Sequence, residues 1–391
     1  MKRNIMIAHS KQARGFSLTE LLIAMAVGAV VLTGATQLFK SGMDATVVVT
    51  QRGEMEENVR AALNLITRDA SMSGSGLPSG GLTLPYGGGN GVSLIGIDQS
   101  GKTWLNADAY VSGNVGTPPV AYNNYMFAII PRPANGMEKG GPVNVPAMAV
   151  SGVIPDSATF IYEDYSFPLN QYTITWPDGT GGLIDVTPPA APPPGFPAIL
   201  SPTGLQLGDI LLLNNSHGWA AGEITGINAG GTQITFANLD ALNINQSGAA
   251  SGNMKYIDSC FYSAAACAGG AAPDTSTVAI RILAVSYFLE VPATAGATPR
   301  LMRQVNGQTA IPVADNILSL KITYDMCTAV VVAGCSGQEN PIGAGYSPNQ
   351  IEKVNVTVTG QSVTNYGNRS KSIAISSSVS TRDLTYINRY K

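Results

Sequence analysis

The chain has 391 residues, of which 12% are charged and 44 are glycine, and its formal net charge is −3. This length accommodates one large domain or two smaller ones. A glycine-rich composition with few charges is typical of an extracellular, loop-rich β protein rather than a cytosolic enzyme. The sequence contains no basic block of the kind that binds nucleic acid, so no nucleic-acid partner is predicted.

The N-terminus combines a basic leader with a long apolar run. Positions 1–15 contain four Lys or Arg residues and no acid, and no charge occurs from Leu21 to Phe39. Nineteen helical residues rise about 28 Å, roughly the thickness of a bilayer's hydrocarbon core. Basic residues before such a span favour a cytoplasmic N-terminus and translocation of everything after Lys40. A cut at Gly15, before the apolar run, would keep the helix on the mature protein, unlike an ordinary signal peptide.

One carboxylate, Glu20, lies at the start of the apolar run. A charged side chain in a membrane span is costly, and such residues usually have a partner. In one interpretation Glu20 extends to the membrane interface. In the other, it pairs with the free amine that cleavage after Gly15 creates at Phe16.

The segment from Gly15 to Leu22, with the sequence GFSLTELL, resembles the class III signal of type IV prepilins and pseudopilins. The resemblance implies a prepilin peptidase that cuts between Gly15 and Phe16 and methylates the new amine of Phe16. It also implies that Glu20 pairs with the N-terminal amine of a neighbouring subunit during assembly. Loss of the leader takes the formal charge from −3 to about −7.

The helical pattern continues past the apolar run. Apolar residues recur at spacings of three and four from Met55 to Ala70, and a Ser- and Gly-rich stretch from Ser71 to Pro78 ends the pattern. We therefore expect one helix from about Phe16 to Met72. It comprises a transmembrane and assembly segment over residues 16–39 and an amphipathic continuation over residues 40–73, which is expected to cover a sheet of its own domain.

Residues 74–276 are predicted to form a β-rich, loop-rich head. Short strands and one stiff proline-rich insert are expected, the strands at Val92–Ile95, Tyr125–Ile130, Thr159–Tyr162 and Asp209–Leu213 and the insert at Pro188–Pro194. Gly96–Thr103 fits the phosphate-loop pattern, but the residues after it support two helical turns at most, and Asp98 places an anion inside the loop. A surface turn is the preferred interpretation.

Strand signals are strongest in the C-terminal β region, residues 277–391. The expected strands are Val278–Glu290, Arg300–Arg303, Ile317–Tyr324, Ile351–Val358 and Lys371–Val379. Apolar and polar residues alternate in them, which predicts a sheet with one packed face, and no helix-length segments intervene, so the sheet should be mostly antiparallel. The predicted class is α+β, with a long N-terminal helix packed on a mostly antiparallel sheet and an enlarged head. The strand order resembles the C-terminal half of PilW-type minor pilins.

Four cysteines fall into two close pairs, Cys260 with Cys267 and Cys327 with Cys335. Translocation would place them in an oxidising compartment, where disulfides persist. Two local bridges are the simplest of the three possible connectivities, and the connectivity stays open. Because His217 is the only histidine after the leader, neither a zinc site nor a histidine-based catalytic dyad is expected. We predict no cofactor and no metal, with calcium left open because loop carboxylates are scattered through the head.

These observations predict a structural protein rather than an enzyme: a minor pilin of a type IV pilus. The resemblance implies a role in assembly or priming, a position at the fibre tip, and links to cell adhesion and twitching motility. The implied partners are other major and minor pilins through the N-terminal helix, the prepilin peptidase and the inner-membrane assembly platform. The implied location is a single pass of the inner membrane with a periplasmic C-terminal domain, and the pilus surface after assembly. A type II secretion pseudopilin and a pilus-borne adhesin or ligand-binding head are the alternatives.

Overall fold

The structure is a computed structural model. It describes residues 15–78, 81–83, 103–104, 125–132, 137–139, 155–177, 180–238, 240, 242, 244–245, 254, 257, 276–292, 298–326, 336–338, 348–362 and 371–381. The chain forms two compact units, residues 1–54 and residues 55–391.

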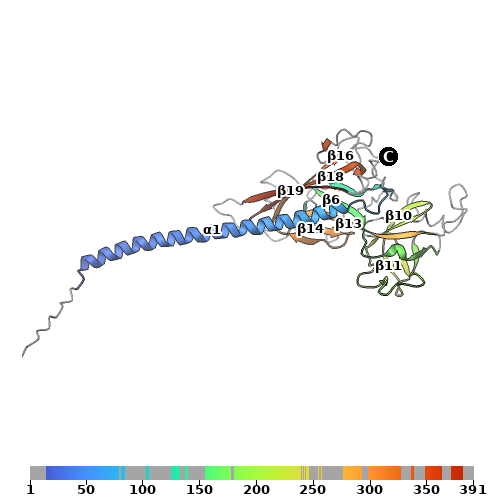
Figure 1. Ribbon diagram of the computed structural model, residues 1–391, viewed down its shortest axis with the longest axis horizontal. Helices are drawn as coiled ribbons and strands as arrows, with labels where there is room; N and C mark the ends of the chain where they lie inside the picture. The colour runs from blue at the N-terminus through green and yellow to red at the C-terminus, as the bar shows by residue number, and fades with distance from the viewer. Residues whose placement is uncertain are drawn as a thin grey trace, which may run out of the picture. The chain divides into compact units, whose positions relative to one another are not determined.

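Helix α1 (Leu18–Met72) is one unbroken helix of 55 residues (Figure 1) and contributes to both units. It confirms the predicted helix, and it begins two residues later than Phe16 because Ser17 caps it. None of its residues in the first unit is buried. In the second unit one side of α1 is buried, and the buried residues are Met55, Val59, Ala62, Leu63, Ile66, Asp69 and Ala70. All six apolar positions of the predicted stripe are in this set.

The largest sheet of the second unit has nine strands and is built around β13 (Val278–Val291), so we call it the β13 sheet. Strand β13 pairs antiparallel with β6 (Ser157–Glu163), β9 (Ile210–Asn215) and β14 (Arg300–Val305), and parallel with β5 (Met137–Lys139). The remaining strands extend it outward from these neighbours, namely β2 (Thr103–Trp104), β4 (Ile129–Arg132), β10 (Gly218–Glu223) and β15 (Ile311–Ala314).

Two four-stranded antiparallel sheets accompany it. The β8 sheet has the order β11 (Gly226–Ile227), β12 (Gln233–Thr235), β8 (Leu183–Thr187) and β7 (Thr173–Thr175). The β18 sheet has the order β17 (Ser336–Gln338), β16 (Ile317–Met326), β18 (Ile351–Gln361) and β19 (Ser372–Ser380). Strands β1 (Leu82–Thr83) and β3 (Tyr125–Met126) form a separate pair, and short 3-10 helices occupy Leu169–Gln171 and Pro348–Gln350.

The main core brings three surfaces together: the buried side of α1, one face of the β13 sheet and the inner face of the β18 sheet. Alternate residues of β13, from Val285 to Val291, belong to this core, while Ile282 and Ala284 belong to a smaller core on the opposite face. This is the alternation expected of a strand whose successive side chains point to opposite faces. Ala279, earlier on β13, contributes to a third core with the β8 sheet.

The α+β class and the antiparallel character of the sheets are confirmed, with β13 and β5 as the one parallel pair among the described strands. The expected strand Val92–Ile95 lies outside the described residues. The β8 sheet was not predicted, since the sequence analysis assigned no strand to Leu183–Thr187. The proline-rich insert Pro188–Pro194 follows β8 directly and contains neither helix nor strand. The β13 sheet includes strands from both sides of the predicted boundary after residue 276.

Candidate assembly segment and the polar clusters of the head

The start of α1 is fixed by a reciprocal pair of hydrogen bonds between Ser17 and Glu20. The backbone N–H of Ser17 donates to Glu20 Oε2 at 3.0 Å, and the backbone N–H of Glu20 donates to Ser17 Oγ at 3.2 Å. This is a capping box, in which two of the unpaired N–H groups at a helix start are satisfied. The negative charge of Glu20 is also favoured near the positive end of the helix dipole. Glu20 therefore has a partner within its own chain.

The rest of the first unit presents a continuous apolar surface. Phe16 is 87% exposed, and the large apolar side chains between Leu21 and Phe39 are exposed as well. By length and composition, α1 contains a stretch able to cross a membrane. Its few hydroxyls bond to their own helix: Thr33 Oγ1 donates to the Ala29 carbonyl at 2.8 Å, and Thr36 Oγ1 to the Thr33 carbonyl at 2.9 Å. Such bonds remove the cost of carrying a hydroxyl into hydrocarbon.

One known family model matches the N-terminal part of the chain. The model for the prokaryotic N-terminal methylation motif matches residues 10–36, which contain the capped helix start and most of the apolar run. This is a type IV prepilin-like chain. No curated protein and no solved structure matches it. The motif and the apolar helix together fit a membrane anchor.

The predicted processing residues of the prepilin-like chain precede its helix. Gly15 and Phe16 are exposed and lie outside α1, whose first helical residue is Leu18. Nothing lies within 4 Å of a Cβ built on Gly15, so this residue is not required by packing in the folded chain. The peptide bond between Gly15 and Phe16 is thus exposed and non-helical.

Other predicted positions fall in different places. The four cysteines, Cys260, Cys267, Cys327 and Cys335, lie outside the described residues, as does the phosphate-loop match from Gly96 to Lys102. His217 is in the turn between β9 and β10, where its backbone N–H donates to Asn215 Oδ1 at 3.0 Å. Within the described part of the chain, no group of three or more His, Cys, Asp or Glu is placed to hold a metal ion.

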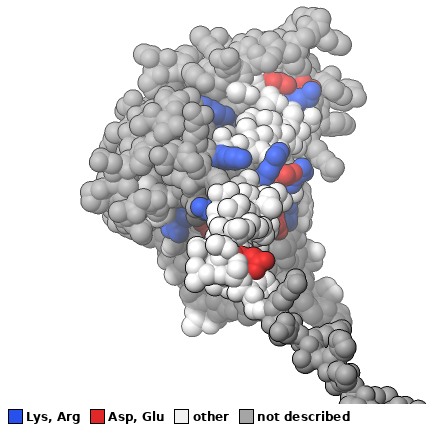
Figure 2. All heavy atoms as spheres, turned by 90° about the vertical axis from the view of Figure 1, so that its left-hand side faces the viewer, with Lys and Arg blue, Asp and Glu red and all other residues white. Residues whose placement is uncertain are grey.

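On the face of the molecule in Figure 2, the described Lys and Arg side chains lie in small separate groups. There, Lys and Arg side chains are spread among Asp and Glu side chains and uncharged surface. A nucleic-acid interface gathers its basic residues in one patch or stripe. The described surface in this view does not have that pattern.

The head contains a buried polar cluster around Asp69 of α1, which we call the Asp69 cluster. Asp69 is 2% exposed. Tyr162 donates its hydroxyl to Asp69 Oδ1 at 3.0 Å, and Tyr287 donates to Asp69 Oδ2 at 2.6 Å. Arg303 Nε also donates to Asp69 Oδ2, at 3.1 Å. Both carboxylate oxygens are therefore occupied by donors from β6, β13 and β14.

Burial and the Asp69 charge shift the pKa values of this cluster. Burial raises the pKa of Tyr162 and of Tyr287, and the adjacent Asp69 carboxylate raises both further, so the two phenols stay protonated far above pH 10. Burial lowers the pKa of Arg303, but the charge interactions and hydrogen bonds with Asp69 and Tyr287 together outweigh it, and the net shift is upward. The cluster is thus one carboxylate held by two neutral hydroxyls and one cation.

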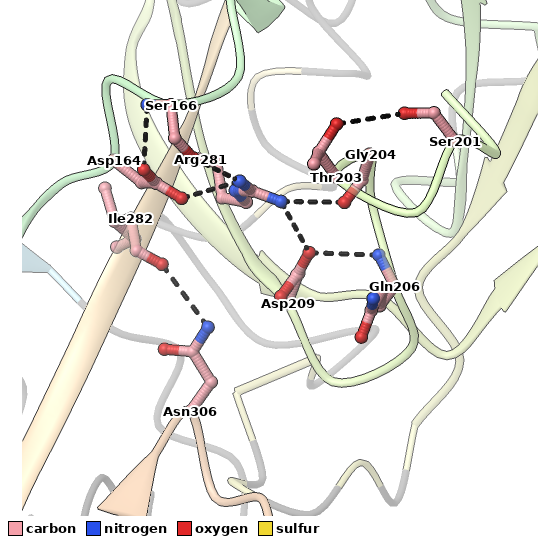
Figure 3. Close-up of polar contacts among 10 residues, drawn as sticks. All are labelled: Asp164, Ser166, Ser201, Thr203, Gly204, Gln206, Asp209, Arg281, Ile282 and Asn306. Atoms are coloured by element: carbon pink, nitrogen blue, oxygen red, sulfur yellow. Dashed lines mark hydrogen bonds and ion pairs between the residues drawn. The ribbon is translucent and has the colours of Figure 1, made fainter. Parts of the chain in front are cut away.

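A second polar cluster, which we call the Arg281 cluster, lies farther along the same face of β13 (Figure 3). Arg281 pairs with Asp164 at 2.6 Å and Asp209 at 3.4 Å, and it donates to the Gly204 carbonyl at 2.8 Å and to Ser166 Oγ at 2.9 Å. Its guanidinium lies 5.5 Å from the ring centre of Phe167. Burial raises the pKa of Asp209, although the Gln206 N–H and the Arg281 charge both act against that rise. Arg281 thus joins β13 to two other segments. Asp164 and Ser166 lie before the first strand of the β8 sheet, and Gly204 and Asp209 lie directly before β9.

Sequence reasoning missed three of these features, and two of them had a signal. Ser17 and Glu20 match the S-x-x-E spacing of a capping box. Asp69 lies three residues after Ile66, on the apolar stripe itself, so it could have been recognised as a buried carboxylate in need of donors. Nothing local distinguishes Arg281 from other strand residues, because its partners come from distant loops.

Proposed function

We propose that this prepilin-like chain is a minor pilin of a type IV pilus, and that it acts by assembly rather than by catalysis. The observation that carries the proposal is the joint occurrence of the methylation motif and an exposed apolar stretch of α1 before Met55. So large a continuous apolar surface is stable only in lipid or against other apolar helices. A bundle of such helices is the core that a pilus provides.

The size of the head supports a minor subunit at the tip or in a priming complex. The second unit extends from residue 55 to residue 391 and contains three multistranded sheets. A head of this size is difficult to repeat along a tightly packed fibre. The strand order from β13 to β19 carries the resemblance to PilW-type minor pilins and favours the pilus over a type II secretion filament.

The proposed mechanism centres on Glu20. Before assembly, its carboxylate accepts the Ser17 N–H and is compensated within the chain. After cleavage, the amine of a neighbouring subunit's Phe16 becomes a stronger, charged partner. Helix bundles that leave Glu20 without this amine are disfavoured, because an unpaired charge in an apolar environment is costly. The pairing would select the axial position of the subunit among its neighbours.

Mass spectrometry of the mature protein tests the processing step. We expect the chain to begin at an N-methylated Phe16, and Gly15→Val to block cleavage because a branched side chain replaces the small residue. Gly53→Ala is the control, since nothing lies within 4 Å of a Cβ at Gly53. An uncut Met1 in wild type, or normal processing of the Gly15→Val chain, would contradict the proposal.

Incorporation into filaments tests the mechanism and the machine. Glu20→Ala should reduce recovery of the subunit in sheared pili at least tenfold, while Glu57→Ala, which removes an exposed carboxylate from the same helix, should not. Two results together would support a pilin: the wild-type subunit is recovered in sheared pili, and a strain that lacks the subunit still secretes normally through its type II system. The reverse pattern would assign the chain to the secretion filament instead.

A further inference from the structure

The buried side of α1 in the head is almost entirely apolar. Val59, Ala62, Leu63, Ile66 and Ala70 all belong to the main core. Hydrophobic contact is non-directional, and these side chains differ little in kind. A shift of the helix by one turn, about 5.4 Å, would place one small or aliphatic residue where another had been. The apolar contacts alone therefore select the position of α1 along the sheets only weakly.

The Asp69 cluster does discriminate between positions. Its three donors converge from adjacent strands: Arg303 is the direct cross-strand partner of Tyr287, and Tyr162 lies on the neighbouring β6. Hydrogen bonds of 2.6–3.1 Å tolerate no displacement of a full turn. Moving α1 would leave a buried carboxylate, two buried hydroxyls and a partly buried guanidinium without these partners.

A second contact, on another sheet, constrains the same helix. A Cβ built on Gly360 of β18 would lie 2.5 Å from Val59 Cγ2 and 3.2 Å from Met55 Cγ. Real Cβ atoms do not approach other atoms as closely as 2.5 Å, so α1 passes over β18 at a point where only glycine fits. Val59 and Asp69 are ten residues apart, so the two constraints act about 15 Å apart along the helix.

We propose that Asp69 and Gly360 together fix the helix register, by which we mean the axial position and rotation of α1 on the β13 and β18 sheets. Asp69 selects the register by its donors, and Gly360 selects it by the space it leaves for Val59. The main role of the Asp69 cluster is thus to select one helix register rather than to stabilise the head. This inference concerns the head alone and holds whether or not the chain joins a pilus.

A photo-crosslinking experiment on the full-length protein in detergent micelles tests the inference. A benzophenone amino acid replaces Leu65, which is partly buried against the main core, and the crosslinked residues are located by mass spectrometry. Wild type should give one dominant product. Asp69→Leu replaces the carboxylate by an apolar side chain of similar size, and we expect the single product to be replaced by two or more. The control is Asn64→Leu, an exposed position on the same helix, which should keep the single product.

Two further variants keep the inference falsifiable if Asp69→Leu does not fold. Tyr287→Phe removes one donor and fills the same space, and it should give a minor second product. Gly360→Ala leaves the Asp69 cluster intact and should change which residues are crosslinked. If every folded variant, Gly360→Ala included, retains the wild-type crosslink, neither Asp69 nor Gly360 sets the register and the inference is wrong.

Discussion

The two stretches of α1, Leu18–Glu54 and Met55–Met72, differ in burial and in how far along the chain their polar partners lie. From Leu18 to Glu54 no side chain is buried, and from Met55 to Met72 one whole side is. The polar contacts differ as well: the hydroxyls of Thr33, Thr36 and Thr46 in the first stretch bond within one helical turn, whereas Asp69 bonds to residues 93, 218 and 234 positions away. A segment with only local polar bonds can pass from lipid to a helix bundle without breaking any, and a segment with long-range bonds cannot.

The largest effect is expected from Asp69→Ala, which removes the long-range bonds of the second stretch. Two buried tyrosine hydroxyls and the partly buried Arg303 guanidinium would lose this acceptor, at a cost of about 3–5 kcal/mol in the free energy of unfolding. Denaturant unfolding measures this. Arg60→Ala is the control, because its ion pair with Glu56 has side chains 63% and 38% exposed and should contribute less than about 1 kcal/mol. A cost for Asp69→Ala as small as that of the control would contradict the account.

Truncating one isoleucine in each stretch contrasts their surroundings directly. Ile66 is fully buried, so Ile66→Ala should destabilise the head by about 2–5 kcal/mol. Ile23 is 64% exposed, and Ile23→Ala should leave unfolding of the head unchanged within about 0.5 kcal/mol. Thermal unfolding of both variants in the same detergent gives the comparison. Equal losses would mean that the two stretches have similar surroundings after all.

Alkaline pH should weaken the second stretch selectively. Tyr162 and Tyr287 have pKa values raised above 10.0, so the folded head keeps two protons that the unfolded chain releases. Their contribution to stability is complete below pH 10 and is lost as the pH rises above it, by about 1.4 kcal/mol per pH unit for each tyrosine. Unfolding followed by circular dichroism from pH 8 to 12 should show this slope. In Tyr287→Phe the slope should be smaller than in wild type, and an unchanged slope would exclude Tyr287 as a source.

The smallest effect is expected at the start of the first stretch. Ser17→Ala removes the hydroxyl that accepts the Glu20 N–H, which should cost about 1 kcal/mol locally. Hydrogen exchange of residues 18–21 in micelles should be faster by about fivefold, with the melting temperature of the head unchanged. Ser17→Thr, which preserves the cap, should exchange like wild type. Faster exchange throughout the head would show that the two stretches are coupled.

The sequence predicted the features that depend on nearby residues, and it did not predict those that depend on contacts between residues far apart in the chain. The apolar stripe from Met55 to Ala70 follows from a 3.6-residue period, which is local, and all of it is buried. The β8 sheet escaped prediction because its strands have two to five residues, too few for alternation to be recognised. The donors of Asp69 could not be named, since their convergence depends on strand register between segments far apart in the chain.

Strand β13 has a consequence for how the chain acquires its fold. Its partners β6 and β9 precede it in the sequence, and β14 follows it. During synthesis from the N-terminus, β6 and β9 emerge before the strand that joins them exists, so the sheet cannot close until Val291 is available. Such long-range closure is slow, and waiting strand edges are prone to aggregate. The nascent head therefore exposes the unpaired edges of β6 and β9 until β13 has been synthesised.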